Sequence, residues 1–386
     1  MELDLFSPDF LRNPYPYYQR LRDLPVQRSP LGVWLISRHQ DVLAVLRGDR
    51  VSSQFSRYSA HARQKPGPAS QIAEHLLPLL DPPQHTRLRR LVAPLLKDQI
   101  MERVLPAIPG LVDELLAGLG SEIELMSQFA APLPVLVISQ LLGIPPADRS
   151  RVRGWAHQFF TIFSASRSRL EQERLSQALL EFRAYLEELL ERRSAVPEDD
   201  LLSLIAGNQE LSLDEKCATC VLLFANGEET LGHLIGNSVL ALLRHHLWRE
   251  PAHWKLALEE LVRYDTPSQI LGRTVVQPLQ LGDTTIPAGE PIYLLLGSAN
   301  RDSQVFEQPD LLNLQRSPNP HLSFGHGTHA CMGAFLARRE AETALTCLLE
   351  RFPRLTLQGE PEWRGHPFRR GLTRFVLQTE QGNVPC

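Results

Sequence analysis

One short glycine-rich segment near the C-terminal end carries the residue types best suited to chemistry. It reads Phe324-Gly-His-Gly-Thr-His-Ala-Cys331-Met-Gly333, and a run with helical periodicity follows from Ala334. Glycines allow backbone angles that other residues resist, so the segment can turn tightly and present one thiol. Backbone N–H groups at a helix N-terminus favour the ionised form of a nearby thiol. We therefore expect Cys331 to act as a thiolate.

Several kinds of site use such a cysteine, and the residue types alone do not choose among them. A lone cysteine is most often a small buried hydrophobe. A nucleophilic cysteine needs a histidine base, and His326 and His329 stand nearby, although no acidic residue in the sequence is paired with either to orient it. A zinc site needs further ligands in a recognisable spacing, and the sequence around Cys331 has none. The fourth possibility is a thiolate ligand to haem iron.

The spacing of the segment resembles the haem-binding loop of the cytochrome P450 family. The family pattern Phe-x-x-Gly-x-x-x-Cys-x-Gly is matched by Phe324, Gly327, Cys331 and Gly333. The resemblance implies that Cys331 is the thiolate ligand to the iron of haem b. It also implies that Phe324, Gly325 and Gly333 belong to the cofactor-binding surface.

The resemblance covers almost the whole chain, from Pro14 to the final strands. It implies a mainly α fold with a smaller β region, built as one domain of residues 1–386. In that fold, haem lies between a long central helix and the cysteine loop. A hydrophobic content of 43% and the lack of a Gly/Ser-rich linker agree with one large core. Strand signals occur at 32–37 and around 270–296. Helical periodicity marks these further stretches: 15–23, 38–47, 85–98, 100–118, 133–143, 149–164, 167–194, 198–206, 212–246, 252–264 and 334–352.

The stretch 212–246 is long enough to cross a domain. Ser212 and Glu215 form a capping-box start, with the serine as N-cap and the acid three residues later. Three glycines in its interior, at 227, 232 and 236, each cost on the order of 1 kcal/mol relative to alanine. We expect close packing or a local bulge at the second and third, and a locally opened helix at the first.

An acid beside an alcohol follows Gly227 within one turn. Such a pair can order water and deliver protons. The segment resembles the family's oxygen-activation motif, small-Gly-x-acid-Thr, which implies catalytic roles for Thr230 and Glu229 in a proton relay. Two residues depart from the pattern, because Asn226 stands where a small residue is commonest and Leu231 replaces a frequent second hydroxyl. The amide of Asn226 can reach toward the distal pocket.

Glu260 and Arg263 place opposite charges three residues apart on a helix, a spacing at which they can meet. Alone the motif is weak, since surface pairs of this kind are common and contribute little. In its position before the cysteine loop it resembles the family's Glu-x-x-Arg signature. That resemblance implies a buried structural network joined by a later arginine, for which Arg316 is the first choice and Arg301 the second.

Haem propionates need cationic or N–H partners when they enter a protein. The run Asp81-Pro-Pro-Gln-His85-Thr-Arg-Leu-Arg89 resembles the family's Asp-Pro-Pro-x-His-x-x-x-Arg helix start. It implies propionate contacts from His85 and Arg89, one helical turn apart. Arg273, which follows the Glu-x-x-Arg helix, and His329, two residues before the cysteine, complete the implied set.

The composition limits the partners. A formal net charge of −4 argues against a nucleic-acid binder. Five cysteines form no framework and the N-terminus shows neither a signal peptide nor a membrane anchor, which predicts a soluble, cytoplasmic protein. The resemblance implies a monomer that receives electrons from a separate ferredoxin and its reductase. Arg87 and Arg90 are expected outside the propionate set, as docking residues for an acidic donor.

The family's reaction places one oxygen atom from O2 into an organic molecule, by hydroxylation or epoxidation, and releases the other as water. We expect a hydrophobic small-molecule substrate from specialised-metabolite biosynthesis. Family topology implies a largely apolar substrate pocket. Its expected residues are Leu223, Asn226, Gln269, Ile270 and Leu271, with Phe159, Phe160, Phe163, the regions 53–80 and 157–175, and the turn near Leu372.

Two alternatives stay open from the sequence. One is a peroxide-driven haem enzyme, against which the retained Glu229–Thr230 pair argues, since direct use of peroxide has less need of a relay. The other is a non-catalytic haem-thiolate sensor or carrier-protein-binding module.

Overall fold

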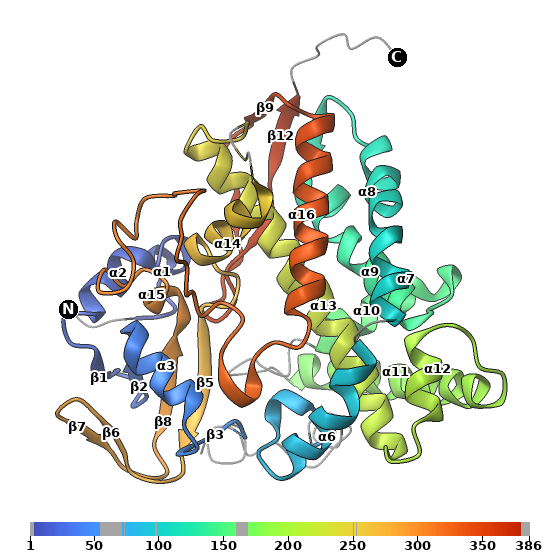
Figure 1. Cartoon of the computed structure of the whole chain (residues 1–386), viewed down its shortest axis with the longest axis horizontal. Helices are drawn as coiled ribbons and strands as arrows, with labels where there is room; N and C mark the ends of the chain where they lie inside the picture. The colour runs from blue at the N-terminus through green and yellow to red at the C-terminus, as the bar shows by residue number, and fades with distance from the viewer. Residues whose placement is uncertain are drawn as a thin grey trace. The chain divides into compact units, whose positions relative to one another are not determined.

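A computed structural model of the chain is mainly helical, with short strands gathered in small sheets (Figure 1). It describes residues 4–54, 72, 74–96, 99–159, 169–249, 251 and 253–379. The chain divides into two compact units, each assembled from separate segments. The first unit comprises Met1–Val51, Ile108–Leu133 and Thr230–Cys386, and the second comprises Ser52–Ala107 and Pro134–Glu229. The expected single domain of residues 1–386 stays a prediction. Within the described ranges, no helix is both long and apolar enough to span a bilayer.

The main sheet has the strand order β1-β2-β8-β5-β3. Its residues belong to the first unit, except for Ser52 of β3. Strands β2 and β8 run parallel, whereas β1–β2 and β5–β8 are antiparallel. Both strand regions expected from the sequence are confirmed. The first region holds β2 (Trp34–Ile36), and the second holds β5 (Ile270–Val275), β6 (Leu279–Leu281), β7 (Thr284–Ile286) and β8 (Pro291–Leu295). Strands β1 (Val26–Arg28) and β3 (Val51–Ser52) lie outside the expected regions.

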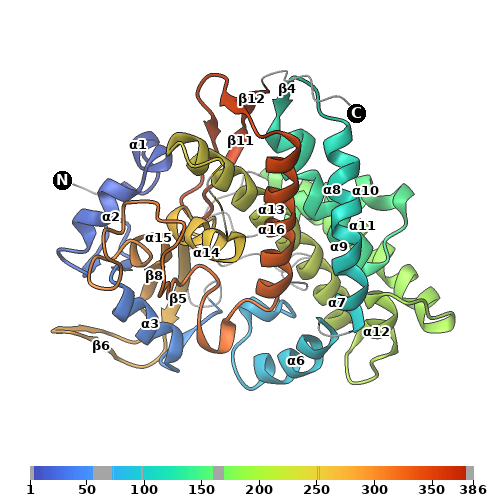
Figure 2. The same cartoon turned by 45° about the horizontal axis from the view of Figure 1, so that its top comes forward.

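A second sheet of the first unit has the order β4-β12-β9, with antiparallel pairing (Figure 2). Strands β10 and β11 form a separate two-stranded ribbon. These strands have only two to four residues, too few for a clear alternating pattern. Their bounds are β4 (Glu122–Glu124), β9 (Leu355–Leu357), β10 (Glu362–Trp363), β11 (Leu372–Arg374) and β12 (Val376–Thr379).

Helix α16, which follows the cysteine loop, packs against α8 and α14 in the first unit (Figure 1). Its apolar face is buried through Ala341, Ala344, Leu345 and Leu348. The helix therefore connects the loop to the core. The helical segments of this unit are α1 (Pro8–Arg12), α2 (Tyr15–Leu21), α3 (His39–Arg47), α8 (Ile108–Ala117), the π-helical η5 (Met126–Ala130), α14 (Trp254–Tyr264), α15 (Leu296–Ala299), the 3-10 turn η8 (Gly327–His329) and α16 (Ala334–Arg351).

The second unit is a group of helices in which α11 packs on α10 and α12. Aromatic rings form part of its core: Trp155 stacks on Phe182 with ring centroids 5.5 Å apart, and Phe182 meets Phe224 edge-on at 6.3 Å. Its segments are η2 (Leu77–Leu79), α6 (Gln84–Val92), η3 (Ala93–Leu96), α7 (Gln99–Val104), η4 (Leu105–Ala107), η6 (Pro146–Asp148), α10 (Arg149–Phe159), α11 (Arg169–Ala195) and α12 (Leu201–Gly207). Helices α9 (Pro132–Leu142) and α13 (Leu213–Arg244) each have residues in both units.

Helix α13 has 32 residues and is about 48 Å long at ~1.5 Å per residue. The capping box at its start is confirmed, because the Ser212 N–H donates to the Glu215 carboxylate at 3.0 Å and the Glu215 N–H donates to the Ser212 hydroxyl at 3.2 Å. A Cβ on Gly232 would lie 2.9 Å from the Ala130 carbonyl, and one on Gly236 would lie 2.6 Å from Met126 Sδ. Close packing on η5 therefore explains these two glycines.

The expected local opening at Gly227 is wrong, because α13 is continuously α-helical from residue 213 to 244. A Cβ at Gly227 would lie 3.4 Å from Ile138, so a neighbouring side chain rather than a bulge limits its size.

Prolines divide one stretch that was expected to be a single helix. The stretch 100–118 separates into α7, η4 and α8, with Pro106 inside the 3-10 turn and Pro109 at the start of α8. A proline cannot donate the helical hydrogen bond and clashes with the preceding turn, and this outweighs the apolar periodicity. The predicted helical residues 97–98 and 160–164 and the pocket residues Phe160 and Phe163 lie outside the described residues, as do residues 55–71, 73 and 160–168 and the side chain of Phe159.

Candidate functional site: the cysteine loop and its supports

The cysteine loop is a series of tight turns that ends at helix α16. The Gly325 N–H donates to the Leu322 carbonyl at 2.8 Å, and the Cys331 N–H donates to the Phe324 carbonyl at 2.9 Å. Gly325 and Gly327 both have φ of +69°, in the left-handed region that other residues rarely adopt. The chain is thereby folded back on itself, and Cys331 is exposed just before Gly333, the N-cap of α16.

Gly327 is also pressed against helix α3 within the first unit. A Cβ at this position would lie 2.4 Å from the Leu46 carbonyl oxygen, which is backbone and cannot swing away. Gly325 has the same φ, but its nearest atom would lie 3.7 Å from a Cβ. The two glycines thus have the same backbone angle, but only Gly325 has room for a Cβ atom.

Gly327→Ala is therefore expected to destabilise the protein more than Gly325→Ala. Both variants carry the left-handed backbone penalty of about 1–2 kcal/mol. Only Gly327→Ala adds the overlap with α3, on the order of 1–3 kcal/mol if it behaves like other overpacked sites. Urea unfolding of the two purified variants measures the difference, and equal midpoints would contradict the close approach.

Polar contacts hold the beginning of the loop. The Asn300 carboxamide accepts from the Leu322 N–H at 2.7 Å and donates to the Ser323 hydroxyl at 2.8 Å. That hydroxyl donates in turn to the Val262 carbonyl of α14 at 2.9 Å. Asn300 was not identified from the sequence, since no local pattern marks a residue whose partners lie more than 20 positions away.

Glu260 and Arg263 form a fully buried bidentate pair on α14, and both side chains are 0% exposed. Arg263 Nε donates to Glu260 Oε2 at 2.7 Å and Nη2 donates to Oε1 at 2.8 Å. The remaining Nη1 donates to the carbonyls of Asn300 and Pro309 at 2.8 and 2.9 Å. The planar guanidinium therefore joins the pair to the residue that holds the cysteine loop.

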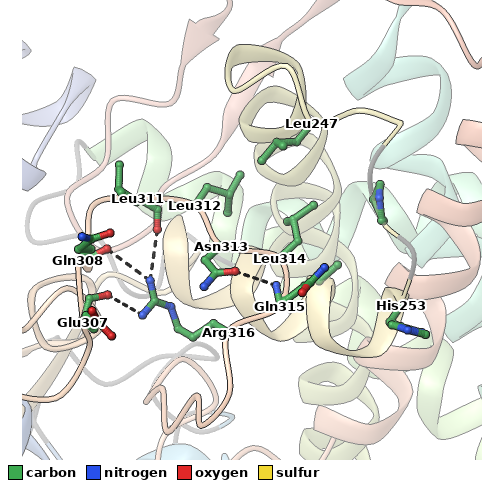
Figure 3. A pocket seen from close by; sticks show the side chains of 12 residues that line it. Leu247, His253, Glu307, Gln308, Leu311, Leu312, Asn313, Leu314, Gln315 and Arg316 are labelled. Carbon is green, nitrogen blue, oxygen red and sulfur yellow. Dashed lines mark hydrogen bonds between the residues drawn. The ribbon is translucent and has the colours of Figure 1, made fainter.

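Arg316 is the later arginine of this network, as first chosen from the sequence. Its Nε donates to Glu260 Oε2 at 3.0 Å, and Nη1 donates to the Glu307 carbonyl at 2.8 Å. Figure 3 shows Arg316 among the carbonyls of residues 307–311, beside a hollow of about 550 Å³ that Leu247 and His253 also line. Arg301, the second choice, instead donates to the Tyr264 carbonyl and to Asp310.

The four expected propionate residues are divided between the units. In the first, Arg273 lies on β5 opposite Ile292, and His329 ends the 3-10 turn η8 of the cysteine loop; both are partly buried. In the second, His85 and Arg89 lie one turn apart on α6, with His85 buried and Arg89 partly buried. Burial, and then the Arg89 charge, lowers the pKa of His85, so this imidazole is neutral at neutral pH.

The two arginines expected to dock a redox partner have acidic neighbours. Arg87 pairs with Glu215, and Arg90 lies 3.8 Å from Glu210. Arg90 and Glu210 are both exposed, so their pair is a weak surface interaction, whereas the carboxylate that Arg87 contacts is largely buried. Their role in docking stays a prediction.

Thr230 and Glu229 are adjacent on α13, and both are partly buried. The boundary between the two units falls between them, so Thr230 belongs to the first and Glu229 to the second. The helix is unbroken here, which fixes the hydroxyl and the carboxyl on successive helical positions.

The expected substrate-pocket residues have varied surroundings. Gln269 is buried, and its Nε2 donates to the Thr266 carbonyl at 2.7 Å. On β5, Ile270 packs in a core cluster with Phe10 and Tyr18, whereas Leu271 packs against the cluster on the other side of the strand. Leu223 of α13 is partly buried. The side chain of Asn226 lies outside the described part of the chain.

Comparison with known proteins agrees with this loop and its supports. Residues 254–382, which hold the Glu260 network and the cysteine loop, match the family model described as Cytochrome P450. The chain is 36% identical to "Cytochrome P450 107B1" of Saccharopolyspora erythraea, with 98% of each chain covered. The chain belongs to the cytochrome P450 family. It is therefore an oxidoreductase with haem b as its cofactor.

Two further relatives extend the comparison. "Polyketide biosynthesis cytochrome P450 PksS" of Bacillus subtilis is 35% identical, over 96% of this chain and 98% of that one. The solved structure of "P450BioI in complex with hexadec-9Z-enoic acid ligated Acyl Carrier Protein" has a TM-score of 0.91 and 34% identity, over 96% of this chain and 100% of that one. The mainly α fold with a smaller β region is thus the cytochrome P450 fold.

The residues of this cytochrome P450 fit a haem group. Cys331 offers one exposed sulfur beside a helix N-terminus, where the thiolate needed for iron ligation is favoured. Among the described residues, no group of three or more histidine, cysteine or acidic side chains is placed to hold a metal ion, so no competing multi-ligand site is seen there. Each unit also offers arginine and histidine side chains, whose N–H groups can donate hydrogen bonds to the propionate oxygens.

Proposed function

We propose that this cytochrome P450 inserts one oxygen atom from O2 into a hydrophobic small molecule of specialised metabolism, with Cys331 as the iron ligand. The observation that carries the proposal is the presentation of Cys331 at the end of a tightly turned glycine loop, shortly before α16. Haem, when bound, supplies the redox chemistry by which O2, two electrons and two protons yield one inserted oxygen atom and one water.

The chain's own residues hold the cofactor and move protons. Cys331 ligates the iron from the loop, and the backbone turn to Phe324 fixes its position. His85 and Arg89 on α6, with Arg273 and His329, would bind the propionates; His85 would contribute an imidazole N–H donor and Arg89 the charge. The Glu229 carboxyl passes protons toward the distal side, and the Thr230 hydroxyl donates the hydrogen bond that directs them.

Thr230→Ala is expected to leave haem binding intact and to uncouple the reaction several-fold. Without the hydroxyl, the side chain that would direct protons from Glu229 is missing, so reducing equivalents are expected to leave as hydrogen peroxide. The measurement is the ratio of product and peroxide formed to NADPH consumed. Thr219→Ala, which changes a buried threonine on the same helix, is the matched control. Full coupling in Thr230→Ala would contradict the relay.

A carrier-bound acyl chain is a specific candidate within this substrate class. The relative solved with an acyl-carrier-protein-bound fatty acid favours it. A free polyketide or lipid is the second candidate substrate, and the polyketide-biosynthesis relative supports it. Leu223, Leu271 and Asn226 are proposed to line the pocket. Ile270 instead packs in the core cluster on the other side of β5, and Gln269 bonds to the Thr266 carbonyl.

Electrons are proposed to come from a separate ferredoxin and its reductase, in the cytoplasm, where NADPH-fed redox chains operate. The exposed Arg87 and Arg90 are proposed contacts for an acidic donor. The protein is proposed to work as a monomer.

A two-step experiment tests the function. Free and carrier-bound small molecules are screened for a shift of the haem spin state, and each hit is incubated with ferredoxin, reductase, NADPH and ¹⁸O2. One labelled oxygen atom in the product supports the proposal. An equal rate with peroxide alone would favour a peroxygenase. Ligand binding without NADPH consumption would favour a sensor or carrier-protein-binding module.

A further inference from the structure

Four side chains from three parts of the first unit meet beside the cysteine loop. They are Glu259 of α14, Arg338 of α16, and His321 and Phe324 of the segment leading into the loop. Arg338 Nε donates to Glu259 Oε1 at 2.5 Å and Nη2 donates to Oε2 at 2.9 Å. Such a bidentate pair fixes the orientation of the guanidinium as well as its position.

The oriented guanidinium lies over the ring of Phe324. Its Cζ is 4.3 Å from the ring centroid, within the range of a cation–π contact. The contact links α16, seven residues after Cys331, to the aromatic residue seven positions before it. The Phe324 carbonyl in turn accepts the Cys331 N–H at 2.9 Å. Arg338 therefore connects the segment before Cys331 to the helix that follows it.

His321 completes the arrangement from the other side of Glu259. Its Nε2 lies 2.9 Å from Glu259 Oε2, and its Nδ1 accepts the Ser323 N–H at 3.3 Å. Burial alone would raise the pKa of Glu259, but the hydrogen bonds from His321 and Arg338, together with the charge of Arg338, outweigh it and lower that pKa to about 2. Glu259 is thus a permanent carboxylate at neutral pH, available to both partners.

We propose that Glu259 and Arg338 act as positioning residues for the Cys331 thiolate, by clamping Phe324 and the start of α16 together. This clamp is distinct from the Glu260 network, since Glu259 and Glu260 hold different arginines. The inference rests on the proposed assignment of Cys331 as the iron ligand. Without the clamp, Phe324 loses its contact with the Arg338 guanidinium, and the Cys331 N–H is released more often from the Phe324 carbonyl.

The neighbouring arginine provides a matched control. Arg339 pairs with Glu342 at 2.8 Å in an exposed i,i+3 contact on the same helix, and its side chain is 52% exposed. Arg338→Gln therefore removes a positive charge from the clamp. Arg339→Gln removes the same charge one residue later, from the solvated face of the helix.

Two readouts test the clamp, and neither of them depends on turnover. Hydrogen exchange at the Cys331 amide is expected to be about ten-fold faster in Arg338→Gln and in Glu259→Gln, because local opening is easier. Arg339→Gln should match the wild type. In the carbon-monoxide complex of the reduced holoenzyme, the two clamp variants should show part of the red-shifted thiolate band replaced by an unshifted band.

The outcomes separate this inference from the function on which it rests. Exchange and spectra of Arg338→Gln that equal those of Arg339→Gln would overturn the clamp. A wild type without the red-shifted band would overturn the ligand assignment instead, whatever the exchange rates. If Arg338→Gln fails to fold, Arg338→Lys retains the charge but not the bidentate fork. Wild-type exchange in that variant would equally overturn the clamp, and intermediate exchange would support it.

Discussion

Replacing Cys331 by serine is expected to abolish the red-shifted carbon-monoxide difference band and to reduce monooxygenase turnover below detection. A thiolate donates electron density to haem iron, which a serine hydroxyl, protonated at neutral pH, does not supply. The loop itself should persist, because the Cys331 N–H bonds to Phe324 through the backbone and α16 starts at Ala334. The loss is therefore chemical rather than structural.

Cys347→Ser is the matched control for this experiment. Cys347 lies on α16 but is removed from the loop, and burial raises the pKa of its thiol, so it stays protonated. This variant should keep the full band. An unchanged band in Cys331→Ser would refute the ligand assignment, and loss of the band in both variants would indicate general damage to α16.

The cysteine loop could be predicted from the sequence because its chemistry is local. The glycines, the cysteine and the following helix lie within one short segment, and the two glycines at +69° are needed for its turns. The Ser212–Glu215 capping box is equally local and was confirmed. Glu260 and Arg263 are three residues apart on one helix, so only their burial had to be inferred from the family resemblance.

The supports of the loop were harder to predict, because their partners are distant in sequence. Glu259 and Arg338 are separated by 79 positions, and each taken alone resembles a solvated charge on an amphipathic helix. The proline breaks in 100–118 did carry a local signal, but apolar periodicity runs through them and concealed it. The amide of Gln269, an expected pocket residue, instead bonds locally to the Thr266 carbonyl three residues earlier.

Glu260→Gln is expected to lower the free energy of unfolding by about 3–5 kcal/mol, the range found when one partner of a buried ion pair is removed. The substitution conserves volume, so the effect comes from charge. Glu260 accepts hydrogen bonds from Arg263, Arg316 and the Asn313 N–H, and its carboxylate is the shared ion-pair partner of the two guanidiniums. A neutral amide would leave both cations buried without their anion. Urea unfolding of the haem-loaded protein measures the loss.

Three comparisons make this result specific to the buried charge. Glu362→Gln removes the partner of Arg374 from an exposed pair at 3.6 Å and should change stability by less than about 1 kcal/mol. Arg316→Gln should lower the free energy of unfolding by less than Glu260→Gln does, because it leaves the Arg263 cation paired with the Glu260 carboxylate. Glu260→Gln should also lose the thiolate band before global unfolding, since Arg263 bonds to the Asn300 carbonyl while the Asn300 side chain holds Leu322 and Ser323 at the loop. A stability equal to that of Glu362→Gln would mean that the α14 network does not support the cysteine loop.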